Sequence, residues 1–409
     1  MNAILHLLLL ILAFLTFKIT LRFVNQPLNL FGLQFLILGI LLNKYFQNFS
    51  SKFINIDLPL VINDLTTPNL QLFIAIVLGF SGFLAGIRLR IKDFLKFNLG
   101  KLLLVIWEFL FPLLTFFLSS YFILSRVKLF ETSQYEILLI SGFVGIISTI
   151  TSTSVIKFLL ERYEIEGKNF NAISSIIPVI NFLGIVSFGV ILSLTQNMVH
   201  KNFQLSSAEI FLISSLTGLI LSFIFFFIVE RKSNEFQITT ILFAFIIFAS
   251  GLAYYLNFSP IIMNLLFGFV LGNIFFKETI PSIFEKAESV FYPLALIFLG
   301  SQIKVVSWSL FISGIIAILI LRYIVVYLSG WFAYKMSYDK NSFSFKIGLG
   351  FYPQGLIAIS LALNFYQLNN SEFNQFILGV FAFVVVLSEV LSTSFTKKFL
   401  IESNELRLK

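Results

Sequence analysis

The sequence predicts an all-α polytopic membrane protein of about thirteen transmembrane helices. Its 409 residues are 58% hydrophobic and only 12% charged, which is about half the charged fraction of a soluble globular protein. Apolar segments of roughly 20 residues, the length that crosses about 30 Å of hydrocarbon, recur along the whole chain. The basic residues lie between these segments and not on one soluble face, so the net charge of +8 does not indicate nucleic-acid binding.

The length criterion places the spans one by one. The first lacks a basic n-region and a small-residue cleavage site, so we interpret it as a retained helix and not as a signal peptide. About nine residues follow Leu400, so we expect a single integral membrane domain over 1–409 and no soluble domain. The expected spans are 2–24, 29–47, 67–86, 99–124, 134–160, 169–195, 206–229, 236–255, 259–275, 288–303, 308–335, 343–365 and 373–399.

The distribution of basic residues predicts the orientation of these spans. At the ends that follow odd-numbered spans there are 21 basic residues, six lie beside even-numbered spans, and Arg322 lies inside a helix. Short cytoplasmic loops collect Lys and Arg. We therefore expect the N-terminus outside and the C-terminus in the cytoplasm, in a membrane that we take to be the bacterial inner membrane.

Two inverted-topology repeats are predicted from three matches that recur in the same order, seven spans apart. Span 2 carries Pro27, Gly39 and Asn43, and span 9 carries Pro260, Gly272 and Asn273. Span 3 ends on Gly86-Ile-Arg88, and span 10 ends on Gly300-Ser-Gln302. Glu108 lies 22 residues after the first glycine, and Arg322 lies 22 residues after the second. Because seven is odd, paired spans run in opposite directions, as in the inverted repeats of secondary transporters.

Three ionisable residues lie deep inside spans, where each costs several kcal/mol and is by default a functional hypothesis. They are Glu108 in span 4, Arg322 in span 11 and Glu389 in span 13. One arginine and two glutamates could form a buried ion-pair cluster, and a purely structural pair is the alternative. Lys157 lies at a helix end, where we expect it to extend toward the membrane surface.

Two spans are expected to be broken. Span 5 contains the hydroxyl-rich run 148–154 (STITSTS), whose side chains compete with the helical hydrogen bonds. Span 12 contains 348–355 (GLGFYPQG), in which Pro353 lacks an N–H and Gly355 follows closely. Broken helices near the middle of the membrane form ion or substrate sites in transporters. For span 5, hydroxyls that only join neighbouring helices are the alternative.

Catalytic and cofactor chemistry has no support in the sequence. There are no cysteines, and the two histidines, His6 and His200, belong to no HExxH motif. No GxSxG, Walker or GxGxxG motif is present. We therefore expect neither an enzyme nor an ATP-driven pump, and no cofactor or metal.

Several of these segments together resemble the monovalent cation/proton antiporter superfamily, the sodium or potassium/proton exchangers. The resemblance extends over nearly the whole chain, from about Pro27 to Leu400. Its most distinctive segment is 348–355. The other segments that carry it are 83–89 (FLAGIRL), 152–156 (STSVI), 259–273 and 292–300.

The resemblance implies a core of spans 4–6 and 11–13, about 99–195 and 308–399, that moves against a dimerising scaffold of spans 1–3 and 8–10. It implies Na⁺ or K⁺ and H⁺ as substrates, and a homodimer in the lipid bilayer. Arg322 falls where such proteins carry a Lys or Arg that neutralises the crossing of the broken helices or pairs with a carboxylate. Thr151 and Ser152, with the neighbouring Thr153, fall where the unwound helix provides oxygens to the ion.

Span 6 departs from the family pattern. There the family carries an acidic residue three positions before a small residue, and this carboxylate binds proton and cation in turn. Counting back three from Gly184 gives Asn181, which offers a carbonyl oxygen but cannot titrate. Arg88 likewise occupies a place that is often acidic in relatives.

Three hypotheses follow from this departure. In the first, the chain is a cation/proton antiporter in which Glu108 or Glu389 is the titrating group beside Asn181 and Arg322. In the second, the same fold transports another solute, and an unpaired Arg322 would favour an anion. In the third, the chain is a non-transporting sensor or assembly partner that has lost the site. Contact between Glu108 and Arg322 would count against anion binding.

Overall fold

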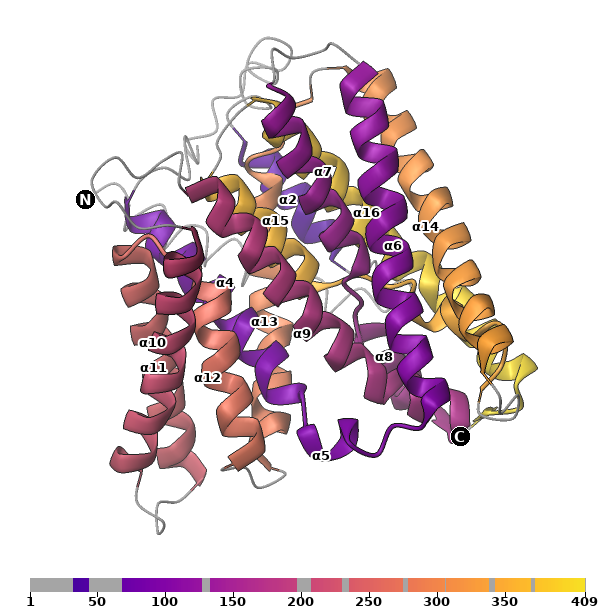
Figure 1. Cartoon of the computed structure of the whole chain (residues 1–409), viewed down its shortest axis with the longest axis horizontal. Helices are drawn as coiled ribbons and strands as arrows, with labels where there is room; N and C mark the ends of the chain where they lie inside the picture. Colours follow the sequence, from indigo (N-terminus) through magenta and orange to yellow (C-terminus); the bar gives the residue numbers. More distant parts are fainter. Residues whose placement is uncertain are drawn as a thin grey trace.

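The computed structural model of the chain is an all-helical bundle with one short β-ribbon (Figure 1). It describes residues 32–43, 68–126, 133–196, 207–229, 235–274, 279–305, 307–337, 343–368 and 372–408. The first half contains α2 (Leu33–Leu41), α4 (Pro68–Arg88), α5 (Ile91–Phe94), α6 (Leu99–Arg126), α7 (Gln134–Thr149), α8 (Ser154–Arg162), β1 (Tyr163–Ile165) and α9 (Lys168–Gln196). The second contains α10 (Ser207–Ile228), α11 (Glu235–Tyr255), α12 (Pro260–Ile274), α13 (Thr279–Gly300), α14 (Trp308–Met336), η1 (Ile347–Phe351), α15 (Leu356–Leu368), α16 (Glu372–Glu402) and β2 (Leu406–Leu408).

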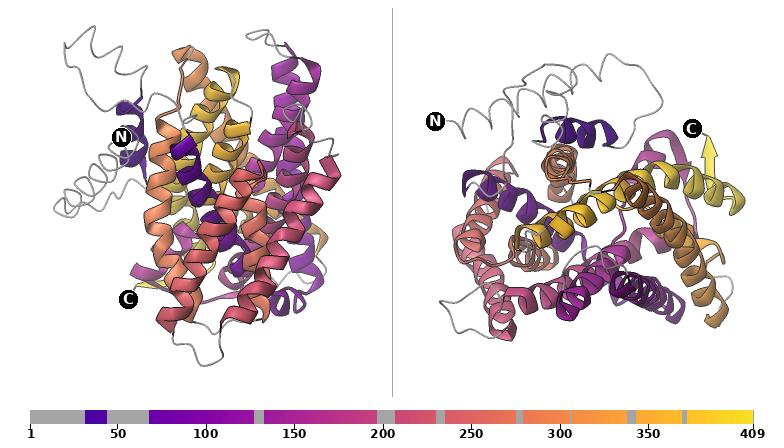
Figure 2. Two further views of the ribbon diagram at one scale, coloured as in Figure 1. Left: turned by 90° about the vertical axis from the view of Figure 1, so that its left-hand side faces the viewer. Right: turned by 90° about the horizontal axis from the view of Figure 1, so that it is seen from above.

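The predicted class of polytopic α-helical membrane protein is confirmed. Within the described ranges, eight helices are long and apolar enough to cross a membrane, and three shorter helices are also apolar. Most of them run roughly parallel to one another (Figure 2). The predicted first span, 2–24, lies outside the described residues.

The helices gather in two groups that flank a middle layer. α10, α11 and α12 stand together on one side, and α6 and α14 lie side by side on the other (Figures 1 and 2). Between them run the broken helices together with α9 and α16. The division into a moving core and a scaffold remains a prediction.

Both predicted helix breaks are present, and they cross. α7 ends at Thr149 and α8 begins at Ser154, whereas η1 ends at Phe351 and α15 begins at Leu356. The two unwound segments are joined where the Ser152 N–H donates to the Pro353 carbonyl at 2.8 Å. The Thr151 hydroxyl also donates to the Phe351 carbonyl, at 3.2 Å. The hydroxyl run and the Gly/Pro cluster therefore open the helices at the same level.

The inverted repeats are visible in how the first helices of each half pack. α4 packs along α12, and α2 packs along α13. A Cβ at Gly39 would overlap the carbonyl of Ile297, just as a Cβ at Gly268 would overlap the carbonyl of Phe83. The residue of α12 that corresponds to Gly39 is therefore Gly268. The sequence match with Gly272 was wrong by one helical turn.

Two asparagines perform the same task in the two repeats. The side-chain amide of Asn43 donates to the Ile303 carbonyl at 2.7 Å, and that of Asn273 donates to the Leu89 carbonyl at 2.8 Å. Each acceptor lies three residues after the matched glycine of its span. Both amides thus satisfy a carbonyl at the end of the neighbouring helix, where the helical ladder leaves it without a partner.

The C-terminal residues fasten one end of α9. β2 pairs antiparallel with β1, and Glu405, just before β2, accepts from the backbone N–H groups of Asn169 and Phe170, both at 2.9 Å. Its Oε1 also accepts from the Asn169 side chain at 2.8 Å. A carboxylate is favourable here because the first turn of a helix has unsatisfied N–H groups and a positive partial charge.

Replacing Glu405 with glutamine should therefore destabilise the protein. Glu405→Gln removes the negative charge at the α9 N-terminus, and we expect the free energy of unfolding to fall by about 1–2 kcal/mol. The measurement is the thermal unfolding midpoint of the detergent-solubilised protein. Glu402→Gln is the matched control, because Glu402 forms an exposed ion pair with Lys346 at 2.6 Å and its loss should cost much less. Equal effects of the two substitutions would contradict this role of Glu405.

Candidate functional site

Arg322 of α14 lies at the centre of the helix crossing and is only 1% exposed. Its Nε donates to the Tyr352 carbonyl at 2.7 Å, and its Nη1 donates to the Ser148 carbonyl. Its Nη2 donates to the carbonyls of Ile150 and Phe351, both at 3.1 Å. These carbonyls end α7 and η1, so they carry the negative partial charge of two helix C-termini. The planar guanidinium directs its N–H groups toward several of these carbonyls at once.

Glu108 lies on α6, the helix that packs against α14, and is 2% exposed. It lies beside Ser329 and interacts electrostatically with Arg322. A Cβ at Gly348 of η1 would come within 3.2 Å of its Oε1. Arg322 is therefore compensated by the carbonyl groups that it binds, which counts against its binding an anionic substrate.

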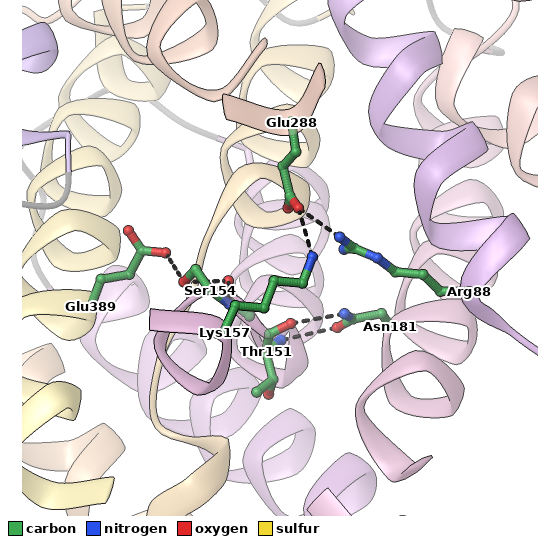
Figure 3. A network of polar contacts seen from close by, with 8 residues as sticks. Arg88, Thr151, Ser154, Lys157, Asn181, Glu288 and Glu389 are labelled. Atoms are coloured by element: carbon green, nitrogen blue, oxygen red, sulfur yellow. Dashed lines mark hydrogen bonds and ion pairs between the residues drawn. The ribbon is translucent and has the colours of Figure 1, made fainter. Parts of the chain in front are cut away.

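Asn181 of α9 holds the break of the first crossing helix. Its Oδ1 accepts from the Thr151 N–H at 3.0 Å, and its Nδ2 donates to the Thr151 carbonyl at 2.8 Å (Figure 3). Both bonds go to one residue of the unwound segment, whose N–H and carbonyl have lost their helical partners. An ionised aspartate could accept the first bond but could not donate the second.

The second crossing helix is held in a related way. The Gln354 N–H donates to the Ser388 hydroxyl of α16 at 3.2 Å, and the Gln354 side chain donates to the Ile147 carbonyl of α7 at 2.7 Å. In each repeat, the helix after the broken span, α9 or α16, thus supplies a polar side chain that accepts from a backbone N–H of the unwound segment.

Glu389 of α16 follows Ser388 and is 1% exposed. Its Oε1 accepts from the Ser154 hydroxyl at 2.6 Å, and its Oε2 accepts from the Tyr292 hydroxyl at 2.5 Å. The Ser152 hydroxyl donates to Ser154 Oγ at 2.8 Å, so a carboxylate and two hydroxyls gather where α8 begins. A Cβ at Gly355 would overlap the Ser152 hydroxyl and lie 3.1 Å from Glu389 Oε1, so this position needs a glycine.

A small cavity lies beside the break. It contains all four residues that we predicted to bind the ion, namely Asn181, Thr151, Ser152 and Thr153. The complete lining is Arg88, Thr151, Ser152, Thr153, Asn181, Glu288, Gly355, Leu356 and Ile357. The structure thus brings the predicted binding residues together, while their role in ion binding remains a prediction.

The three deeply placed ionisable residues do not form one cluster. Glu108 interacts with Arg322 only electrostatically, whereas the described contacts of Glu389 are with Ser154 and Tyr292. Pro353 and Gly355 both lie in the unwound segment before α15. Pro353 supplies the carbonyl that joins the two breaks, and Gly355 faces Glu389.

Glu288 of α13 was not among the residues predicted to form the site. Its Oε2 accepts from Arg88 Nη2 at 2.6 Å and from Lys157 Nζ at 3.4 Å (Figure 3). Glu288 is the first residue of the predicted span 288–303, but α13 begins nine residues earlier, at Thr279. Lys157, expected to extend toward the membrane surface, is instead in an ion pair. The available signal was the spacing of Glu288 and Tyr292, which places them on one helical face.

The comparisons with known proteins agree with this geometry. A family model described as "Sodium/hydrogen exchanger, transmembrane" matches residues 7–400. The solved structure of the sodium proton antiporter MjNhaP1 from Methanocaldococcus jannaschii at pH 8 superposes with a TM-score of 0.66 at 19% identity, covering 96% of this chain and 100% of that one. A structure of the same antiporter from an electron-microscopy map gives 0.61 at 18% identity, covering 97% and 96%. No curated protein matches. At these identities the structural likeness shows the fold.

The Asn181 clamp predicts a pH-dependent effect of Asn181→Asp. The ionised carboxylate would face the Thr151 carbonyl without a proton to donate, so we expect a loss of about 1–3 kcal/mol of stability at alkaline pH. At acid pH the protonated carboxyl can donate again, so stability should recover as pH falls. The measurement is the thermal unfolding midpoint across pH, with Asn171→Asp, at an exposed position of α9, as control. A loss that does not change with pH would contradict the clamp.

Proposed function

The chain belongs to the transmembrane sodium/hydrogen exchanger family, and on that premise we propose that it exchanges Na⁺ or K⁺ for H⁺ across the membrane. The family is one of transporters and not of enzymes. The observation that carries the proposal is a buried carboxylate, Glu389, bonded to the first residue of α8 just after the helix break. Such a group can hold a proton or a cation in turn, and exchange through one site needs that alternation.

Glu389 suits this role better than the other carboxylates at the crossing. Glu288 is compensated by Arg88 and Lys157. Glu108 lies beside Ser329 and Gly348, and not beside the predicted binding residues 151–153. The described hydrogen bonds of Glu389 come from hydroxyl groups and not from a cation. A hydroxyl donates to a charged carboxylate, but it can also rotate and present its oxygen to a bound ion. Removing the proton from Glu389 therefore leaves a negative charge that a cation can neutralise.

The cation would enter through the cavity beside the break. Its oxygen ligands would be Glu389 and the hydroxyls of Ser152 and Ser154, with Thr151 and Thr153 nearby, because small hard cations prefer oxygen ligands. Asn181 would not titrate, and its amide would keep the unwound backbone in place. This assignment keeps the predicted binding segment and moves the titrating group from span 6 to span 13.

Two alternatives concern the substrate and the activity. Transport of an anion at Arg322 has little support, because four of its N–H groups are used by carbonyls. A non-transporting sensor or assembly partner would keep the same fold without ion flux. Flux measurements on the purified protein separate these alternatives.

The proposal includes the setting in which exchange takes place. The family and the apolar helices support an integral membrane protein. We further propose the bacterial inner membrane, an external N-terminus, a cytoplasmic C-terminus and a homodimer. The excess of basic residues after odd-numbered spans supports the orientation.

Glu389→Gln should abolish proton-coupled cation flux. In proteoliposomes with an imposed Na⁺ or K⁺ gradient, we expect the wild-type protein to move H⁺ and the variant to fall below about a tenth of that rate, because an amide cannot exchange a proton. Glu108→Gln should retain flux, and Glu136→Gln, in an exposed helix cap, serves as the surface control. Coupled flux that survives Glu389→Gln would contradict the assignment. A wild-type protein that moves none of the three ions would favour the non-transporting alternative.

The proposed motion of core against scaffold can be tested because the chain has no cysteines. A Cβ at Gly379 of α16 would touch the side chain of Ile303, just after α13, so a cysteine pair at 303 and 379 lies within disulfide reach. Oxidation of this pair should stop ion flux, and reduction should restore it. The matched pair at Gly314 and Val380 joins two core helices and should leave flux unchanged when oxidised. Full flux through the oxidised 303–379 pair would contradict movement between these groups.

A further inference from the structure

One face of α13 contacts both elements that carry the proposed ion site. Glu288 and Tyr292 are four residues apart, one above the other on the helix. Glu288 reaches Lys157 of α8 at 3.4 Å, and Tyr292 reaches Glu389 of α16 at 2.5 Å. α8 and α16 belong to the predicted core, whereas α13 belongs to the predicted scaffold. Two polar contacts thus connect the two groups at the level of the break.

These contacts close a ring through three helices. Ser154, three residues before Lys157 on α8, donates to Glu389 at 2.6 Å. The ring therefore runs from α13 through Lys157 to Ser154, then to Glu389 and back to α13 through Tyr292. A cation that binds between Ser154 and Glu389 must enter this ring, and it changes what the carboxylate can accept.

The other charged groups near Glu389 are Glu288 and Arg88 of the scaffold and Lys157 of the core helix α8. Arg88 of α4 binds Glu288 at 2.6 Å, a contact inside the scaffold. Glu288 interacts electrostatically with both Glu389 and Tyr292. The Lys157 contact with Glu288 is longer, at 3.4 Å. The short hydroxyl–carboxylate bond of Tyr292 is therefore the contact between core and scaffold that depends most directly on the charge of Glu389.

The strength of that bond follows the state of the site. A hydroxyl bond to an ionised carboxylate is roughly twice as strong as one between neutral groups. Protonation of Glu389 removes the charge from the acceptor, and a bound cation competes for the same oxygens. In either occupied state the hydroxyl of Tyr292 loses much of its attraction to α16.

We propose that Tyr292 is a positioning residue that holds the core against α13 only while Glu389 is ionised and empty. Binding of a proton or a cation at Glu389 weakens the bond and releases the core. The empty carrier is then the state that cannot reorient, which makes exchange obligatory instead of allowing either ion to leak alone. This inference rests on the proposed function, because it assigns a coupling role at the same site.

The test compares two efflux rates in proteoliposomes loaded with radiolabelled Na⁺ at alkaline pH. In the wild-type protein, efflux into a Na⁺-containing medium should exceed efflux into a Na⁺-free medium, because the empty carrier returns slowly. In Tyr292→Phe, efflux into the Na⁺-free medium should rise roughly tenfold, in line with the loss of one bond to a charged group. The ratio of the two rates should fall toward one. A general loss of folded protein lowers both rates equally and leaves the ratio unchanged.

Two further variants make the outcome decisive. Tyr254→Phe removes a hydroxyl that donates to Gln71 at 3.1 Å inside the scaffold, and its ratio should equal that of the wild type. Tyr292→His keeps a donor on a ring, and it should restore part of the ratio. An unchanged ratio in Tyr292→Phe, or an equal fall in Tyr254→Phe, would overturn the role of Tyr292. A wild-type protein without any Na⁺ efflux would instead overturn the proposed function, and this inference with it.

A second experiment measures the position of the core by disulfide formation, without any transport assay. In the cysteine pair at 303 and 379, the rate of disulfide formation reports how long α16 stays near the end of α13. We expect Na⁺ to slow the reaction at least twofold when Tyr292 is present, because the ion releases the core. With Tyr292→Phe, Na⁺ should have no further effect. The same Na⁺ dependence with and without the hydroxyl would overturn the proposal.

Discussion

The structure depends on one constraint: the backbone of two helices is opened where water cannot satisfy it. Inside a membrane every exposed N–H and carbonyl needs a partner within the protein. Arg322 meets four carbonyls, Asn181 meets both groups of Thr151, and the Gln354 amide meets the Ile147 carbonyl. Each of these side chains comes from a part of the chain distant in sequence. The crossing is therefore possible only when the surrounding helices are already in place, so fold and site are specified together.

This constraint also decides which residues remain available for ion chemistry. A side chain that holds unwound backbone in place cannot also alternate between a proton and a cation without letting that backbone go. Asn181 and Arg322 are occupied in this sense. Glu389 is differently placed, since it meets hydroxyl groups whose oxygens can be donors or ligands. The polar groups at the crossing thus divide into a set that supports the backbone and one carboxylate whose partners can change.

The sequence predicted what local chemistry determines. Hydroxyl runs and a Gly/Pro cluster weaken a helix wherever they occur, so the breaks before Ser154 and Leu356 could be placed in advance. A charge in the middle of an apolar span, such as Glu389, can likewise be recognised from the sequence alone.

Contacts between distant helices were not predictable in the same way. Glu288 was overlooked because α13 begins nine residues earlier than its apolar segment, and no local pattern pairs Tyr292 with α16. Gly39 was matched to the wrong glycine of α12 because Gly268 and Gly272 lie one helical turn apart, and only their packing against α4 distinguishes them.

The repeats give a reason for the position of Glu389. In the first repeat, the Thr151 N–H of the unwound segment is satisfied by Asn181 of the following helix. In the second repeat, the Gln354 N–H is satisfied by Ser388 of the following helix. Asn181 and Ser388 thus occupy corresponding places on either side of the crossing, and Glu389 is the neighbour of the second. An inverted repeat offers two related positions for a titrating group, and a carboxylate at either one lies next to an unwound segment. The amide in α9 therefore need not remove the site from the fold, because α16 carries a carboxylate directly after Ser388, and this carboxylate accepts from the first residue of α8.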